Sequence, residues 1–137
     1  MKSILYSFPG LKNVCCLFST AHAGSMVWRV PTVDDDPVVA NREAFRREAG
    51  FGRWAEVHQV HGDALVPAAG APEVEPASLV KADGQYTMER DVGVVVKTAD
   101  CQPIFFARED GGAVAGLHVG WRGNAMNFPG TAVWRLC

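Results

Sequence analysis

The stretch PIFFAREDGGAVAGLHVG, residues 103–120, holds two apolar runs on either side of a sharp turn signal. The first run is PIFFA (103–107) and the second is GAVAGLHVG (112–120). The Asp-Gly pair between them favours a tight hairpin, because these residues tolerate the backbone conformations that short β-turns need. The stretch therefore predicts two antiparallel strands. Alternation along the second strand puts His118 on one face with the small residue Gly116, which leaves room beside the imidazole.

Three further apolar runs predict strands, at residues 14–20, 54–62 and 91–97. The run at 54–62 alternates with a period of two, whereas the run at 91–97 is continuously apolar, as in a strand covered on both faces. Residues 67–78 are rich in proline and alanine and predict an exposed loop.

A helix is predicted over residues 37–49. Asp36 is a suitable N-cap, Pro37 fits the first helical position, and Gly50 marks the end. A second, short helix is indicated in TAVWRLC, which follows Pro129 and Gly130. The chain thus mixes strands and helices in one α/β pattern.

The composition indicates one globular domain over residues 1–137, since 48% of the residues are hydrophobic and 20% are charged. A net charge of -2 offers no basic surface for nucleic acid and no polybasic membrane anchor. No apolar run approaches the ~20 residues of a membrane span, and Pro9 and Gly10 interrupt a stretch that imitates a secretory signal. The four cysteines lack the spacing of a disulfide framework, so we expect reduced thiols and a cytoplasmic location.

His61, Cys101 and His118 form the candidate site, because each lies at or beside the end of a predicted strand and strand ends converge on clefts. Two imidazoles and a thiolate suit a borderline-soft divalent metal, and three ligands leave a fourth tetrahedral position open, as in catalytic zinc sites. Alternatives remain. A single histidine is more often a hydrogen-bonded structural residue, and a lone cysteine is more often a small apolar residue of the core. A Cys-His pair also suits a thiolate nucleophile with its base, and His58 and His22 are further candidates.

Three residues beside these candidates have two possible roles each. Asp100 either orients a histidine as a hydrogen-bond acceptor or caps a turn. Arg122, between glycines, either binds phosphate or carboxylate with its guanidinium or forms a surface salt bridge. Trp121 either stacks on a base or packs.

The chain resembles the YfiH-type family, also called laccase-domain or polyphenol oxidase proteins, from about Phe18 onward. Four motifs in the family's order carry the resemblance: HQVHG (58–62), ADGQYT (82–87), KTADCQPIFF (97–106) and LHVGWRG (117–123). The resemblance implies zinc ligation by His61, Cys101 and His118. It also implies a layered α/β/β/α fold with mixed sheets, similar to the catalytic domain of cytotoxic necrotizing factors.

The activity implied by the resemblance is purine nucleoside phosphorolysis. Adenosine, inosine or guanosine would react with phosphate to give the free base and ribose 1-phosphate, and adenosine deamination would be a second reaction. Within the chain, Arg122 is the candidate anion site and Asp100 a second candidate catalytic residue.

Two departures from the family pattern lead to further expectations. The motif FSTAHAGS (18–25) has Ala21 where the family usually has arginine, and the domain is expected to be incomplete at its C-terminus. Three alternative functions follow from the family labels and these departures: a copper-dependent polyphenol oxidase with Cu2+ on the same ligands, a peptidoglycan-precursor editing hydrolase, and an inactive metal-binding fragment. Four histidines are too few for a full multicopper cluster.

Overall fold

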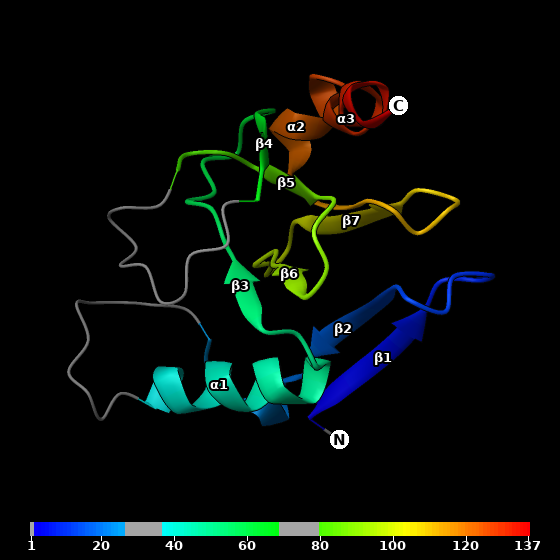
Figure 1. Cartoon of the computed structure of the whole chain (residues 1–137). Helices are drawn as coiled ribbons and strands as arrows, with labels where there is room; N and C mark the ends of the chain where they lie inside the picture. The colour runs from blue at the N-terminus through cyan, green and yellow to red at the C-terminus, as the bar shows by residue number, and fades with distance from the viewer. Residues whose placement is uncertain (1, 27–36, 69–79) are drawn as a thin grey trace. The chain divides into compact units, whose positions relative to one another are not determined.

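The computed structural model describes residues 2–26, 37–68 and 80–137, which form two compact units, Met1–Gly52 and Arg53–Cys137. We call them the N-terminal and the C-terminal unit and describe each by itself (Figure 1). The expectation of one domain over residues 1–137 stays a prediction. None of the helices in the described ranges has the length and hydrophobicity needed to span a bilayer.

The N-terminal unit contains an antiparallel strand pair and a helix. Strand β1 (Ser3–Ser7) pairs with β2 (Cys15–Ser19), which confirms the strand predicted at 14–20, and a short 3-10 helix, η1 (Ala21–Ala23), follows. The predicted helix is confirmed with the same bounds as α1 (Pro37–Ala49). Its proposed N-cap, Asp36, lies outside the described residues.

The end of α1 has a local cause. Gly50 adopts a φ of 76°, and its N–H donates to the carbonyl of Arg46 at 3.0 Å. A glycine enters this left-handed region without steric cost and so terminates the helix where the sequence predicts.

A four-stranded mixed sheet is the centre of the C-terminal unit. Its order is β4 (Leu65–Pro67), β5 (Gly84–Thr87), β8 (Val114–Val119), β7 (Gln102–Ala107). The pair β4 and β5 is parallel, and the other neighbours are antiparallel. Strands β7 and β8 confirm the predicted hairpin, whose turn is closed by hydrogen bonds from Gly111 N–H to the Arg108 carbonyl and from Arg108 N–H to the Ala113 carbonyl.

Two helices cover one face of this sheet. Helices α2 (Trp121–Ala125) and α3 (Phe128–Leu136) follow β8, and the core joins side chains of α3 to those of β8. Its fully or nearly buried members are Leu117, Val119, Phe128 and Ala132. The predicted C-terminal helix is thus confirmed and begins at Phe128, whereas α2 was not predicted.

A parallel pair of short strands, β3 (Arg53–Ala55) and β6 (Val92–Val94), lies against the opposite face (Figure 1). The buried amide of Gln85 joins these layers by donating to the carbonyls of Ala55 and Val95, each at 3.3 Å. The expected space beside His118 is absent at Gly116, because an added Cβ there would meet Val96 at 2.9 Å and Val94 at 3.1 Å. This glycine permits close packing of the two layers.

Two strand predictions are too long. The strand predicted at 54–62 ends at Ala55, and beyond it an isolated bridge joins His58 to Lys81. The strand predicted at 91–97 is confirmed only for Val92–Val94. Of the loop predicted at 67–78, Pro67 belongs to β4 and residues 69–78 lie outside the described residues. The mixed α/β fold class is confirmed.

Candidate metal centre

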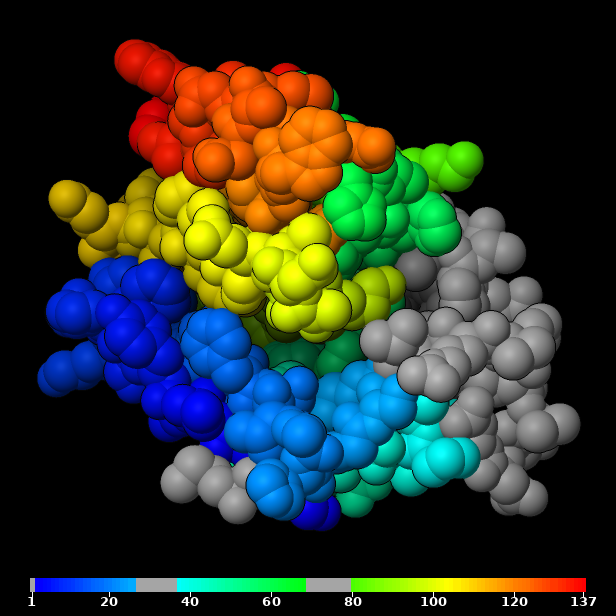
Figure 2. Space-filling model, turned by 180° about the vertical axis from the view of Figure 1, so that it is seen from behind, coloured from blue at the N-terminus to red at the C-terminus, as the bar shows by residue number. Residues whose placement is uncertain are grey.

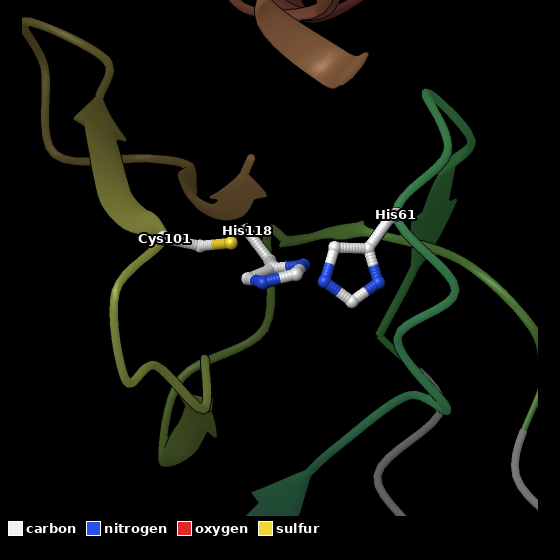
Figure 3. A group of neighbouring side chains, drawn as sticks. All are labelled: His61, Cys101 and His118. Carbon is white, nitrogen blue, oxygen red and sulfur yellow. The ribbon is translucent and has the colours of Figure 1, made fainter. Parts of the chain in front are cut away.

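The side chains of His61, Cys101 and His118 converge in the C-terminal unit. Their nearest candidate ligand atoms all lie within 4.8 Å of one another, and Figure 3 shows the three side chains pointing toward each other from separate segments. The two imidazole rings have centroids 4.8 Å apart and planes at 76°. His118 is buried, Cys101 is half-buried and His61 is exposed, so the group is open to solvent on the His61 side.

The β7–β8 pairing explains how Cys101 and His118 meet. His118 lies on β8 and pairs with Pro103 of β7, and Cys101 directly precedes Gln102, the first residue of β7. Hydrogen bonding between two antiparallel strands therefore brings together residues that are distant in the sequence.

Gly120 leaves the space that the cluster needs. A Cβ added at Gly120 would lie 3.0 Å from the Cys101 sulfur and 3.4 Å from Cδ2 of His61. A side chain there would press on the Cys101 sulfur and come into contact with the His61 ring.

His61 lies in a turn that is held by a buried carboxylate. Asp83 accepts hydrogen bonds from the backbone N–H groups of Val60 (3.2 Å), His61 (2.9 Å) and Gly62 (2.7 Å). His61 itself has a φ of 62°, a left-handed conformation that a strand does not contain. These hydrogen bonds replace the ladder of the predicted strand, which explains why the strand prediction at 54–62 is wrong beyond Ala55.

The same carboxylate holds the ring of His118. Nδ1 of His118 lies 2.8 Å from Oδ1 of Asp83, and both side chains are buried. Burial by itself would raise the pKa of Asp83, but hydrogen bonds from His118 and from the three backbone N–H groups outweigh it and lower the pKa. Asp83 is thus a charged acceptor at neutral pH, and Nε2 is the remaining ring nitrogen of His118.

The surroundings of Cys101 do not favour a free thiolate. Desolvation raises the pKa of this thiol. The charge of Asp100, the hydrogen bond that the thiol donates to Asp100 and the charge of Asp83 raise the pKa further. A thiolate nucleophile and a thiolate ligand both need nearby positive charge, which these carboxylates do not supply and a bound cation would supply. The arrangement therefore favours the role of Cys101 as a ligand for a cation over that of an independent nucleophile.

Asp100 and Arg122 differ in their positions relative to the cluster. Asp100 is exposed beside the Cys101 thiol, and the carboxylate that holds a histidine is Asp83 instead. Arg122 is exposed in α2 directly after Gly120 and Trp121, with its guanidinium carbon 5.2 Å from the Trp121 ring centroid. Trp121 is 76% exposed, so packing in a core is not its role, and Figure 2 shows α2 and α3 at the surface of this unit. Within the described ranges, Arg122 forms no salt bridge.

Sequence reasoning did not assign a role to Asp83, although the ADGQYT motif contains it. A signal was present, since Asp83 and Gln85 are polar residues at a strand start among the small residues Ala82 and Gly84. Such a pattern indicates buried polar groups with specific partners, but it does not identify those partners.

Residues 18–137 match the family described as multi-copper polyphenol oxidoreductase laccase. The match covers most of the chain, so the chain belongs to this family. It is 36% identical over 95 residues to a purine nucleoside phosphorylase of Pseudomonas aeruginosa, an alignment covering 68% of this chain and 36% of that protein. It is 35% identical over 109 residues to the purine nucleoside phosphorylase YlmD of Geobacillus stearothermophilus, covering 74% of this chain and 39% of that protein.

Solved structures show the same fold. A crystal structure of a Neisseria meningitidis protein matches with a TM-score of 0.76 and 28% identity, covering 98% of this chain and 57% of that one. The crystal structure of YlmD matches with a TM-score of 0.64 and 35% identity, covering 71% of this chain and 38% of that one. The chain therefore spans well under two thirds of the length of these relatives.

Proposed function

We propose that this chain carries the zinc centre of a purine nucleoside phosphorylase. The substrates would be adenosine, inosine or guanosine with phosphate, and adenosine deamination would be a second activity. The convergence of His61, Cys101 and His118 supports the proposal most directly. The names of the relatives supply the substrate class.

The donor set fits zinc. Zinc bonds of about 2.0–2.3 Å to nitrogen and sulfur place the tetrahedral ligand atoms of two imidazoles and one thiolate about 3.3–3.6 Å apart. The three candidate atoms lie within 4.8 Å, so they would move closer together to bind one zinc ion. Three protein ligands leave one position for water or substrate. When bound, the ion acts as a Lewis acid and lowers the pKa of a coordinated water to about 7.

Residues around the cluster are our candidates for contacting phosphate, contacting the purine and moving a proton. In phosphorolysis, the bond from the ribose C1′ to the base nitrogen breaks, and a bond from C1′ to a phosphate oxygen forms. Arg122 is our candidate for the phosphate contact, because its exposed guanidinium has no carboxylate partner within the described ranges. Trp121 offers an exposed aromatic face to a purine. Asp100, exposed beside Cys101, is our candidate for moving a proton as the base leaves.

We further propose a cytoplasmic location. All four cysteines are free thiols, and Cys15 and Cys137 are exposed. Exposed thiols remain reduced in a reducing compartment.

The test combines metal analysis with turnover in the 137-residue chain. Wild type, His61→Ala, Cys101→Ala and His118→Ala are compared for zinc and copper content and for release of base from adenosine plus phosphate. His58→Ala is the matched control, since His58 is exposed and lies outside the cluster. We expect about one zinc per chain in wild type and in His58→Ala, and strongly reduced zinc in the other three variants.

The possible outcomes separate the parts of the proposal. An equal zinc content in wild type and all variants overturns the ligand assignment. One zinc per chain without phosphorolysis or deamination keeps the metal centre and removes the activity. Turnover that persists without metal but disappears in Cys101→Ala supports a thiolate nucleophile instead. Copper in the purified protein, together with oxidation of phenols, supports the alternative of a polyphenol oxidase.

A further inference from the structure

We propose that Asp83 is a positioning residue that forms the metal centre before any ion binds. It would do so in two ways, by keeping the proton of His118 on Nδ1 and by fixing the turn that carries His61. This inference rests on the proposed metal centre, because it concerns the two histidines of that site.

The carboxylate of Asp83 uses all of its acceptor positions. Oδ1 accepts from the His61 N–H at 2.9 Å and lies 2.8 Å from Nδ1 of His118. Oδ2 accepts from the N–H groups of Val60 at 3.2 Å and Gly62 at 2.7 Å. An ionised carboxylate only accepts hydrogen bonds, so Nδ1 of His118 must be the donor. The lone pair of the neutral imidazole is then on Nε2, the nitrogen that would face the ion.

The effect on His61 is conformational. A non-glycine residue with a φ of 62° is strained, and it persists only when its surroundings hold it. The hydrogen bonds from three consecutive N–H groups to one carboxylate provide this restraint. Asp83 therefore controls one ligand through its ring and another through its backbone, although it is not itself a member of the ligand group.

The nearly isosteric change Asp83→Asn separates this role from simple packing. An asparagine has one acceptor oxygen and one NH2 group in place of two oxygens. With its oxygen toward the Val60 and Gly62 N–H groups, it satisfies two backbone donors, and its NH2 faces Nδ1 of His118 and the His61 N–H, so that one backbone donor loses its acceptor. With the opposite orientation, the NH2 would face those two backbone donors without an acceptor. The first orientation makes Nδ1 an acceptor and moves the His118 proton to Nε2, where it blocks metal binding.

The experiment measures the histidine tautomers and zinc affinity separately. Histidine ring 15N spectra of the metal-free 137-residue chain report which nitrogen of His118 carries the proton. Zinc affinity is measured by competition with a chelator. Asp110→Asn is the matched control, because Asp110 also accepts hydrogen bonds from a backbone N–H, that of Gly112, and from a side chain, that of Arg108.

We expect the Nδ1–H tautomer of His118 in wild type and in Asp110→Asn, and the Nε2–H tautomer in Asp83→Asn. Zinc affinity should fall by about 10–100-fold in Asp83→Asn alone. A folded Asp83→Asn protein with unchanged tautomer and affinity overturns the proposal. Should that variant fail to fold, an Nε2–H tautomer in the metal-free wild type overturns it equally. A wild type that shows the Nδ1–H tautomer but binds no zinc removes the proposed metal centre and leaves the tautomer assignment intact.

Discussion

Gln59 and Lys97 are joined by two hydrogen bonds across 38 positions of sequence. The Gln59 amide donates to the Lys97 carbonyl at 2.7 Å and accepts from the Lys97 N–H at 2.8 Å. The Lys97 ammonium is also paired with the Glu56 carboxylate. The side chain of Gln59 thus takes the place of a strand partner and links the turn before His61 to the segment before Cys101.

We predict that Gln59→Leu lowers both folding stability and zinc affinity, because it leaves a part-buried N–H and carbonyl without their partner. The loss of stability should be about 1–3 kcal/mol. Gln59→Glu should have an intermediate effect, since its carboxylate still accepts from the N–H but cannot donate to the carbonyl. Urea unfolding and chelator competition measure the two effects. Wild-type values for Gln59→Leu in both assays would contradict this role.

We predict that Gly120→Ala weakens zinc binding more than it weakens the fold. The added methyl group would press on the Cys101 sulfur at 3.0 Å and would lie in ordinary contact with the His61 ring at 3.4 Å. A metal site needs its ligands held within about 0.5 Å of the productive geometry, and we expect the affinity to fall on the order of tenfold, or about 1.4 kcal/mol.

Gly123→Ala is the control for this change, because its added Cβ meets backbone and Phe128 atoms at 3.4 Å or more. Chelator competition on both variants, with circular dichroism to verify folding, is the measurement. Equal zinc affinity in Gly120→Ala and wild type would mean that the cluster has more space than the structure shows.

We predict that Gly116→Ala destabilises the C-terminal unit. A Cβ at this position would lie 2.9 Å from Val96, 3.0 Å from Phe105 and 3.1 Å from Val94. Overpacking of this kind costs about 1–3 kcal/mol. Urea unfolding of the variant, followed by tryptophan fluorescence, should show a lower midpoint than wild type. A midpoint at or above that of wild type would show that the two layers can separate without cost.

We predict that Glu43 titrates at an unusually low pH. Hydrogen bonds from Arg46 and then from Arg47 lower the pKa of Glu43 from its ordinary value of 4.5 to about 2. Since the pKa is lower in the folded chain, the interaction stabilises α1 above about pH 4.5 and is lost as the pH falls through about 2. Carboxyl NMR titration measures the pKa, and Glu43→Gln removes the signal. A midpoint near 4.5 would show that the arginines are not bound in solution.

Local signals were sufficient for α1 and for the β7–β8 hairpin. Pro37 and Gly50 restrict the backbone at the two ends of α1, and the Asp-Gly pair does so in the hairpin turn. Such signals act over a few residues, so they can be identified in the sequence without knowledge of the fold.

Strands β4 and β5 were missed because three or four residues are too short to show a period. They are strands because neighbouring strands supply their hydrogen-bond partners. The predicted end of the strand that begins at β3 was wrong for a related reason. The pattern at 54–62 alternates correctly, but Asp83 and Lys97 provide hydrogen-bond partners that no local pattern reveals.

The sequence by itself determined the residue types of the candidate centre, one thiol and two imidazoles, and the ends of the elements that carry their own start and stop signals. Only the tertiary structure decided that these three side chains meet and that Asp83 holds two of them. The physical reason is that hydrogen bonds to the buried Asp83 carboxylate join residues 22 to 35 positions apart, and pairing of β7 with β8 brings Cys101 beside His118. Such contacts depend on how the whole unit packs, and no short stretch of sequence encodes them.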